Sequence, residues 1–363
     1  MPRSSALSTH FNSRLASLGW DTWFEQRFES FAAEGLQPAR IAADYGAEYL
    51  VHSASETTRG VLGRRLRSES TVVPSVGDWV GVLPRAWDTP AVIHAVVERR
   101  TSFSRKVVHR ETREQVLAAN VDVAFVVATA GDANVRRIER YLAMAWQSGA
   151  MPAVVLTKSD LTESLDDIRV EIEAVAAGTP VVATSAVTGE GVDEMNLQLA
   201  GSRTGVLLGP SGAGKSTLIN RMAGADVMQT REVFRTGEGR HMTSHRELIE
   251  LPGGGMIIDT PGLREAQLWV GEGALDSLFE DIEALELRCR FPDCEHRTEP
   301  GCAIKAALAD GSLDLGRLDS YRKLQRELRS VAARSDARLR ADERRKWKQI
   351  TVNNRARERY LRR

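Results

Sequence analysis

A glycine-rich run in the second half of the chain limits the possible folds more than any other stretch. It has the pattern G-x-x-x-x-G-K-S and comprises Gly209, Pro210, Ser211, Gly212, Ala213, Gly214, Lys215 and Ser216. An apolar run precedes it, and a helical pattern begins at its end and continues through Thr217. Glycines let successive N–H groups turn toward one anion at a helix N-terminus, where the helix dipole adds to the attraction. We therefore predict a phosphate-binding loop rather than an ordinary glycine-rich turn. Lys215 would reach the β- and γ-phosphates, and the Ser216 hydroxyl would bind Mg²⁺.

A second candidate loop lies upstream of the first. The apolar run Val154-Val155-Leu156 ends in Thr157-Lys158-Ser159-Asp160. Ligands of α/β domains bind at the carboxyl ends of strands, where Asp160 would lie. Its carboxylate can accept hydrogen bonds from N1–H and the 2-amino group of guanine, and adenine offers no donors there. Taken alone, T-K-x-D could also be a capping turn, and Thr157 stands where asparagine is usual.

A third loop supports the prediction that the site binds guanine. A short apolar run from Val181 to Ala183 leads into Thr184, Ser185 and Ala186, small residues whose backbone N–H can contact guanine O6. Both guanine loops precede the phosphate loop, whereas an ordinary GTPase has the reverse order. The sequence therefore predicts a circularly permuted nucleotide domain.

A D-x-x-G motif follows the strand candidate Met256 to Ile258. Asp259 would hold Mg²⁺ through water, and the Gly262 N–H would sense the γ-phosphate. The next residue is Leu263, at the position where many GTPases carry a glutamine that orients water. Leucine cannot orient water, so we predict slow hydrolysis by the protein alone.

Between the phosphate loop and this motif lies a polar, glycine-rich stretch, residues 236–245. We predict a switch loop in which Thr243 closes onto Mg²⁺ and His241 or His245 approaches the γ-phosphate. The candidate catalytic residues are therefore His241, Thr243 and Lys215. A solvated loop residue is the alternative for either histidine.

The three cysteines of the chain lie within fourteen residues. They form the pattern C-x₄-C-x-H-x₅-C, with the candidate ligands Cys289, Cys294, His296 and Cys302. Three thiolates and an imidazole, without a carboxylate, are typical of a closed tetrahedral Zn²⁺ site. We predict one structural zinc ion and no catalysis by it.

Composition adds limits on domains and partners. The 363 residues suffice for two or three domains. Short β-rich runs from about residue 37 to 100 predict a small barrel, and alternating apolar strands and helices from Val121 predict an α/β domain with a mostly parallel sheet. From Arg317 to the last residue, 17 Lys or Arg stand against 6 Asp or Glu. Such a tail suits a polyanion, or is a solvated helix.

No apolar run approaches the ~20 residues of a membrane span, and residues 1–11 lack a secretory apolar core. We expect a cytoplasmic protein with no membrane partner.

Taken together, these motifs resemble one family, the circularly permuted, small-ribosomal-subunit-dependent GTPases of bacteria, the RsgA type. The resemblance runs from Val76-Gly77-Asp78-Trp79 through Phe103-Ser104-Arg105-Lys106 to the cysteine cluster. It implies an N-terminal OB-fold, a central permuted GTPase domain and a C-terminal zinc domain. The corresponding boundaries are a helical extension at 1–36, the OB-fold at 37–102, the GTPase domain at 103–280 and the zinc domain with its basic tail at 281–363.

The resemblance also implies a role in late maturation of the small ribosomal subunit, contact with its rRNA, and hydrolysis of GTP to GDP stimulated by the subunit. We expect a monomer. The family's switch pattern reads G-(R/K/Q)-H-T-T-T, and this chain has Met242 in place of one threonine. OB barrels bind nucleic acid through a groove, so Arg59, Arg64, Arg65 and Arg67 are candidates for RNA contact, with a solvated strand face as the alternative.

Two other classes of function remain open at this point. One is a GTP-gated rRNA-binding checkpoint in which turnover is incidental. The other is a phosphate-loop ATPase or kinase, against which Asp160 argues. Another family of permuted ribosome-assembly GTPases is a further alternative, although few of them combine an upstream barrel with a downstream zinc cluster.

Overall fold

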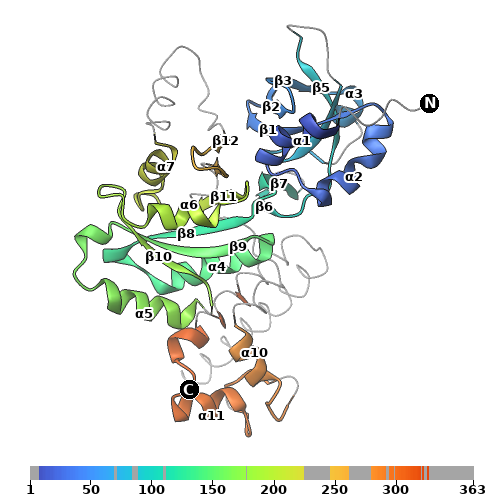
Figure 1. The fold of residues 1–363 in the computed structure, drawn as a ribbon. Coiled ribbons are helices and arrows are strands. Elements are labelled where there is room, and N and C mark those ends of the chain that lie inside the picture. Colours follow the sequence, from blue (N-terminus) through green and yellow to red (C-terminus); the bar gives the residue numbers. More distant parts are fainter. Residues whose placement is uncertain are drawn as a thin grey trace, which may run out of the picture. The chain divides into compact units, whose positions relative to one another are not determined.

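The computed structural model forms two compact units, residues 1–107 with 113–268, and residues 108–112 with 269–363 (Figure 1). The residues it describes are 8–68, 72–83, 89–108, 112–176, 178–224, 246–260, 279–291, 294–297, 299–319, 321–322 and 325–326. Within these ranges, no helix is both long enough and apolar enough to cross a membrane.

The first unit begins with two helices, α1 (Ser8–Ser17) and α2 (Thr22–Ala33). Asp21 caps α2, because its carboxylate accepts hydrogen bonds from the backbone N–H groups of Trp23 and Phe24. Phe24 and Phe28 are buried beneath the helix. These two residues lie four positions apart, so they share the face of α2 that packs against the protein interior.

A closed five-stranded barrel follows. Its strands are β1 (Gln37–Asp44), β2 (Tyr49–Ser53), β3 (Thr57–Leu62), β4 (Trp79–Leu83) and β5 (Ala91–Val96), with the short helix α3 (Arg64–Ser68) between β3 and β4. The strands pair in the ring β1-β2-β3-β5-β4, which β4 closes by pairing with β1. Closure removes the free edges that a small open sheet would expose. This is the predicted OB-fold.

The nucleotide domain is built on a second set of strands, ordered β10-β9-β8-β11-β13-β12. Their bounds are β8 (Val123–Thr129), β9 (Met151–Thr157), β10 (Val181–Thr184), β11 (Thr204–Leu208), β12 (Arg246–Glu250) and β13 (Met256–Asp259). β12 is antiparallel to β13, and the other neighbours pair in parallel. The strands are almost continuously buried, because helices cover both faces.

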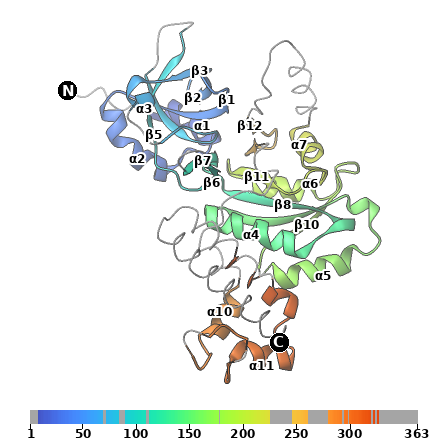
Figure 2. The ribbon, with the colours of Figure 1, turned by 180° about the vertical axis from the view of Figure 1, so that it is seen from behind.

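The covering helices are α4 (Val135–Ser148), α5 (Leu165–Val175), α6 (Val192–Gln198) and α7 (Lys215–Ala223). Figures 1 and 2 show α4 and α5 on one face and α6 and α7 on the other. The chain runs outward from β8 to β10, returns to the centre at β11, then crosses to β12 on the other side and turns back into β13, which lies between β11 and β12. The strand order therefore reverses between β8 and β11, and α/β folds bind ligands at such a switch point.

The barrel and the nucleotide domain share hydrogen bonds between strands. β1 pairs with β12, with Ala43 opposite Glu247 and Asp44 opposite Arg246. A hairpin of β6 (Ser102–Val108) and β7 (Thr112–Ala119) lies between the two domains in sequence. The sequence pattern did not predict β12 or its pairing with the barrel.

A buried arginine also joins the two domains. Arg40 lies in β1 and is 1% exposed. Its guanidinium donates hydrogen bonds to the carbonyls of Leu18, Gly77 (3.3 Å) and Asn120 (3.2 Å), and to the Thr204 hydroxyl (2.8 Å). Burial lowers the pKa of Arg40 to about 10, so it remains charged at neutral pH. One side chain thus binds the N-terminal helices, the barrel and the nucleotide domain.

Replacement of Arg40 by leucine is expected to lower the free energy of unfolding by about 3 kcal/mol, because several buried acceptors lose their donor. Urea denaturation of the full chain measures this change. Arg64→Leu, which removes an exposed arginine on α3, is the control and should change stability by less than about 0.5 kcal/mol. Equal stability of the two variants would contradict the assignment of Arg40 as the junction.

The second unit contains α10 (Glu280–Glu286) and α11 (Ala303–Asp310). Its described core is small and comprises Phe279, Ile282, Cys302, Ile304, Ala307, Leu313, Leu318 and Tyr321. Arg317 forms a two-fold ion pair with Asp281, at 2.6 and 2.7 Å. A core of this size needs additional stabilisation, and Cys302 of the cysteine cluster is part of it.

Candidate nucleotide site and metal centre

The predicted phosphate loop connects β11 to α7 at the switch point between β8 and β11. Gly209 approaches β8 so closely that an added Cβ would lie 2.3 Å from the Val127 carbonyl oxygen. Only glycine fits there, since any side chain would collide with backbone. Lys215 is buried, and its ammonium group donates to the carbonyls of Gly209 (2.7 Å) and Pro210 (2.5 Å). The positive charge is therefore held within the loop, where a phosphate would be bound.

Ser216 occupies the first turn of α7 and is half-buried, whereas Thr217 is exposed. Ser216 therefore lies at the N-terminus of α7, the end of the helix that the loop presents to an anion. These positions agree with the strand-loop-helix context that a phosphate loop requires.

The first guanine loop is bound directly to the phosphate loop. Thr157 ends β9, and its hydroxyl lies 2.8 Å from the Ala213 carbonyl oxygen and 3.2 Å from that of Ala128. Lys158 has a left-handed backbone (φ 59°), and its ammonium group donates to the Gly212 carbonyl at 3.3 Å. Two segments far apart in sequence thus form one site. The threonine hydroxyl makes this link between the loops, although asparagine is usual at its position.

The rest of this loop lies at the carboxyl end of the sheet. Ser159 is buried, and Asp160 is exposed within a short 3₁₀ turn, Ser159–Leu161. An exposed carboxylate beside the loops is available to a ligand. Its role in base recognition remains a prediction.

The second guanine loop lies beside the first, because Thr184 in β10 is directly opposite Thr157 in β9. Thr184 and Ser185 are fully buried. The Ser185 hydroxyl accepts from the Thr188 N–H at 3.2 Å, and the Ser185 N–H donates to the Glu190 carbonyl at 3.0 Å. Ser185 is thus engaged within the loop, and contact of the Ala186 N–H with guanine O6 stays a prediction.

The D-x-x-G motif is described only in part. Asp259 ends β13 next to the strand that carries the phosphate loop, opposite Glu247 of β12. Gly262, Leu263 and the switch-loop residues 236–245, including His241 and Thr243, lie outside the described residues. The predicted roles of these residues in Mg²⁺ binding and hydrolysis stay predictions.

A cleft of about 310 Å³ lies beside the phosphate loop, on the side of α4. Its lining includes Lys158 and the phosphate-loop residues Pro210 to Ala213, with Asn134, Arg137 and Tyr141 from α4 and the residue before it. This side of the loop is therefore open rather than packed. Sequence reasoning did not identify the α4 residues, which carry no motif.

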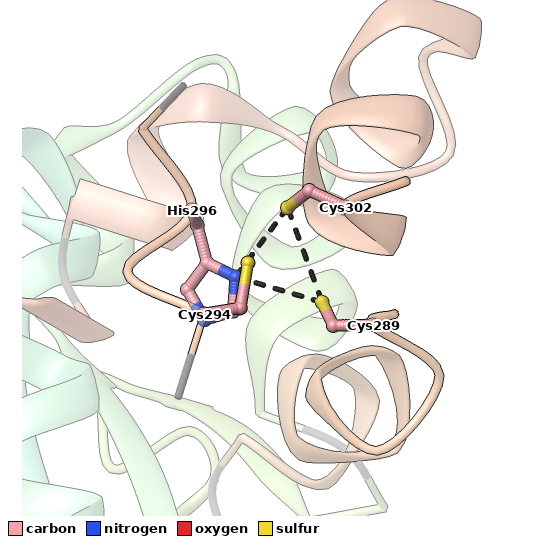
Figure 3. A group of neighbouring side chains, drawn as sticks. All are labelled: Cys289, Cys294, His296 and Cys302. Atoms are coloured by element: carbon pink, nitrogen blue, oxygen red, sulfur yellow. Dashed lines mark hydrogen bonds between the residues drawn. The ribbon is translucent and has the colours of Figure 1, made fainter. Parts of the chain in front are cut away.

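The second unit brings all four predicted zinc ligands together. The three sulfur atoms and a ring nitrogen of His296 lie within 4.8 Å of one another (Figure 3). His296 Nδ1 is 3.6 Å from Cys289 Sγ and 3.4 Å from Cys302 Sγ. A tetrahedral ion with Zn–S bonds of ~2.3 Å requires ligands spaced in this way.

The cysteine thiols differ in how easily they ionise. Desolvation, reinforced by the neighbouring thiols of Cys302 and Cys289, raises the pKa of Cys294 to about 11. At Cys289 desolvation is outweighed by hydrogen bonds from the backbone N–H groups of Ala303 and Ile304, which lower the pKa. Cys294 is therefore the thiol that ionises with difficulty unless a cation is bound. A divalent metal removes this penalty, because a coordinating thiol loses its proton. The donor set and its spacing therefore fit zinc.

The predicted RNA-binding arginines lie mostly on a helix. Arg59 is in β3, 3.9 Å from Glu48, but Arg64, Arg65 and Arg67 occupy the exposed surface of α3. The alternative of a solvated strand face is therefore wrong for these three residues, and their contact with RNA stays a prediction. Arginine and leucine favour helices, and the Arg67 N–H donates to the Gly63 carbonyl at the start of this turn.

The sequence of this chain is similar to those of a known family of proteins. The model of the RsgA GTPase family matches residues 96–269. A small ribosomal subunit biogenesis GTPase RsgA from Opitutus terrae is 47% identical over 95% of this chain and 98% of its own. That of Streptomyces avermitilis is 43% identical, over 98% and 96%.

Two solved structures are also similar. The crystal structure of YjeQ from Thermotoga maritima has a TM-score of 0.59 at 25% identity, covering 81% of this chain and 98% of that one. YloQ, described as a circularly permuted GTPase, has a TM-score of 0.56 at 26% identity, covering 81% and 96%. Each likeness covers more of the chain than the nucleotide domain alone.

Proposed function

This chain belongs to the RsgA family of GTPases, and from that premise we propose that it hydrolyses GTP to GDP and phosphate while bound to the small ribosomal subunit, in the subunit's late maturation. The observation that carries the proposal is the joining of the phosphate loop to the guanine loop through Thr157 and Lys158. A site of this kind binds phosphate and base together, so it recognises a whole guanine nucleotide.

Different residues of the site would bind the phosphates, the base and Mg²⁺. Lys215 is held at the phosphate loop to neutralise the β- and γ-phosphates. Asp160 selects guanine through the N1–H and 2-amino donors, and Ala186 donates to O6. Ser216, Asp259 and Thr243 are the residues that would hold Mg²⁺, which neutralises charge on the phosphates when bound. His241 is the candidate for positioning water.

Slow unaided turnover is part of the proposal. Leu263 occupies the position of the water-orienting glutamine of many GTPases, and its side chain has no polar atom. The small subunit would then supply or order the missing group. Because the subunit stimulates hydrolysis, conversion of GTP to GDP would determine when the protein is released from the subunit.

We expect small ribosomal subunits to accelerate GTP hydrolysis by about 10²-fold, the effect of adding one well-placed polar group to a transition state. The measurement is phosphate release with and without purified subunits, together with co-sedimentation in GTP, GDP and a non-hydrolysable analogue. Large subunits serve as the control. Sedimentation that depends on nucleotide without any acceleration would favour a checkpoint in which turnover is incidental.

The proposal includes contact with rRNA. The exposed arginines of α3 and the excess of Lys and Arg after Arg317 support it, since clustered cations release counterions from phosphate backbones. It also includes a monomeric protein in the cytoplasm, where small subunits mature. One structural zinc ion, bound by Cys289, Cys294, His296 and Cys302, would hold the second unit together.

A further inference from the structure

The Nε2 atom of His296 makes a hydrogen bond on the side of the ring that faces away from the cysteines. Nδ1 faces the cysteine sulfurs, and Nε2 lies 2.9 Å from Glu286 Oε1. An ionised carboxylate only accepts hydrogen bonds, so Nε2 carries the ring proton and Nδ1 presents its lone pair to the metal. Zinc-binding histidines are commonly oriented by such a carboxylate. The side chains of His296 and Glu286 are only 11% and 30% exposed, which shields the bond from water.

The second oxygen of Glu286 continues the network to the C-terminal side of the unit. Glu286 Oε2 accepts from the Tyr321 hydroxyl at 3.0 Å, and Gln325 Nε2 donates to that hydroxyl at 3.3 Å. The Tyr321 ring is buried and packs edge-to-face on Phe279, with centroids 5.3 Å apart. The hydroxyl is therefore held toward Glu286 by packing as well as by hydrogen bonds.

The backbone of His296 also receives support from the same segment. His296 has a φ of 57°, in the left-handed region that non-glycine residues rarely adopt. The Arg322 guanidinium donates to the His296 carbonyl at 3.1 Å. Tyr321 and Arg322, neighbours in sequence, thus fix the ring and the backbone of one zinc ligand.

We propose that Glu286 is a positioning residue, which orients the His296 ring so that Nδ1 faces the zinc ion. Tyr321 and Arg322 then couple the zinc site to the segment that begins the basic tail. This inference rests on the zinc ion of the proposed function. Coupling is reciprocal: a segment that tightens zinc binding is itself held in place by zinc. Zinc then orders the first residues of the part of the chain that carries the excess of positive charge.

The test begins with the zinc affinity of the full chain, measured in competition with a chromophoric chelator. Glu286→Leu keeps the size of the side chain but cannot accept from Nε2–H, and we expect its zinc affinity to fall by about 10- to 100-fold. Glu286→Gln retains an acceptor oxygen and should stay within about threefold of wild type, since orientation is kept. If leucine and glutamine have equal effects, the hydrogen bond accepted from Nε2–H does not orient His296 and the proposal is overturned.

Glu295→Leu is the matched control. Glu295 is adjacent to His296 in sequence, but its carboxylate is exposed and lies 3.7 Å from Arg297. The same loss of charge at this position should leave zinc affinity unchanged. A fall as large as that of Glu286→Leu would mean that charge alone is responsible, which also overturns the proposal.

Hydrogen exchange tests the coupling. Removing zinc from the wild-type chain should abolish amide protection around Tyr321, and Tyr321→Phe should reduce this protection with zinc still bound. Full protection in both cases would refute the coupling. A wild-type chain that binds no zinc would refute the zinc assignment itself. If instead the wild type binds one zinc ion and Glu286→Leu binds it equally well, only the present inference fails.

Discussion

Replacing Asp160 by asparagine is expected to change the base that the site accepts. The carboxylate accepts from both N1–H and the 2-amino group of guanine, whereas the asparagine amide presents a donor in place of one acceptor. GTP affinity should fall by about 10²- to 10³-fold, the effect of breaking a charged hydrogen-bonded pair. Xanthine has a carbonyl where guanine has the amino group, so affinity for its triphosphate should rise. Calorimetric titration with GTP, XTP and ATP measures all three affinities.

Asp166→Asn is the matched control for this exchange. Asp166 is an exposed aspartate in the first turn of α5, a few residues further along the same connection. Its replacement should alter none of the three affinities. Unchanged GTP binding by the Asp160 variant, or equal binding of ATP and GTP by the wild type, would show that the loop does not select guanine.

Removing the zinc ion is expected to unfold the second unit while the nucleotide site stays intact. The described apolar core of this unit is small, and zinc binding contributes about 10 kcal/mol or more in small zinc domains. Cys302→Ser, or chelation of the wild type, should therefore abolish amide protection in residues 279–319. The contacts described for the phosphate loop lie within the first unit, so GTP affinity should stay within about twofold.

Reconstitution provides the control. Zn²⁺ added back after chelation should restore protection, whereas Mg²⁺ should not, because it binds oxygen ligands rather than thiolates. The Cys302→Ser variant should respond weakly to either ion. Amides that stay protected after complete removal of zinc would show that the apolar core suffices, and the structural role of the metal would be wrong.

Much of the nucleotide domain could be predicted because its signals are local. The helical pattern predicted to begin at the end of the phosphate loop is α7 in the structure. The strand candidates that lead into Thr157, Thr184 and Asp259 are present as β9, β10 and β13, since continuous apolar runs between helices leave few alternatives. The permuted order of the loops, read from the sequence, agrees with the strand order around β8 and β11.

What the sequence did not predict depends on partners distant along the chain. Arg40 is an ordinary residue of a β-rich run, and its oxygen acceptors lie up to 164 positions away. Glu286 carries no motif that marks it as a partner of His296. At Thr157 the sequence showed a departure from the usual asparagine, and the structure explains it. The threonine hydroxyl donates to the Ala213 carbonyl of the phosphate loop. Short elements are the hardest to identify, as the arginines of α3 illustrate.

The pairing of β1 with β12 means that the barrel is not an interchangeable module. β1 closes the barrel through β2 and β4, and it also extends the sheet that carries the nucleotide loops. A barrel grafted from another protein would need a strand in the same register and an arginine at position 40. Recombination at the boundary between the domains would seldom supply both. The two domains are therefore expected to be inherited together, and a change in either strand must be accommodated by the other.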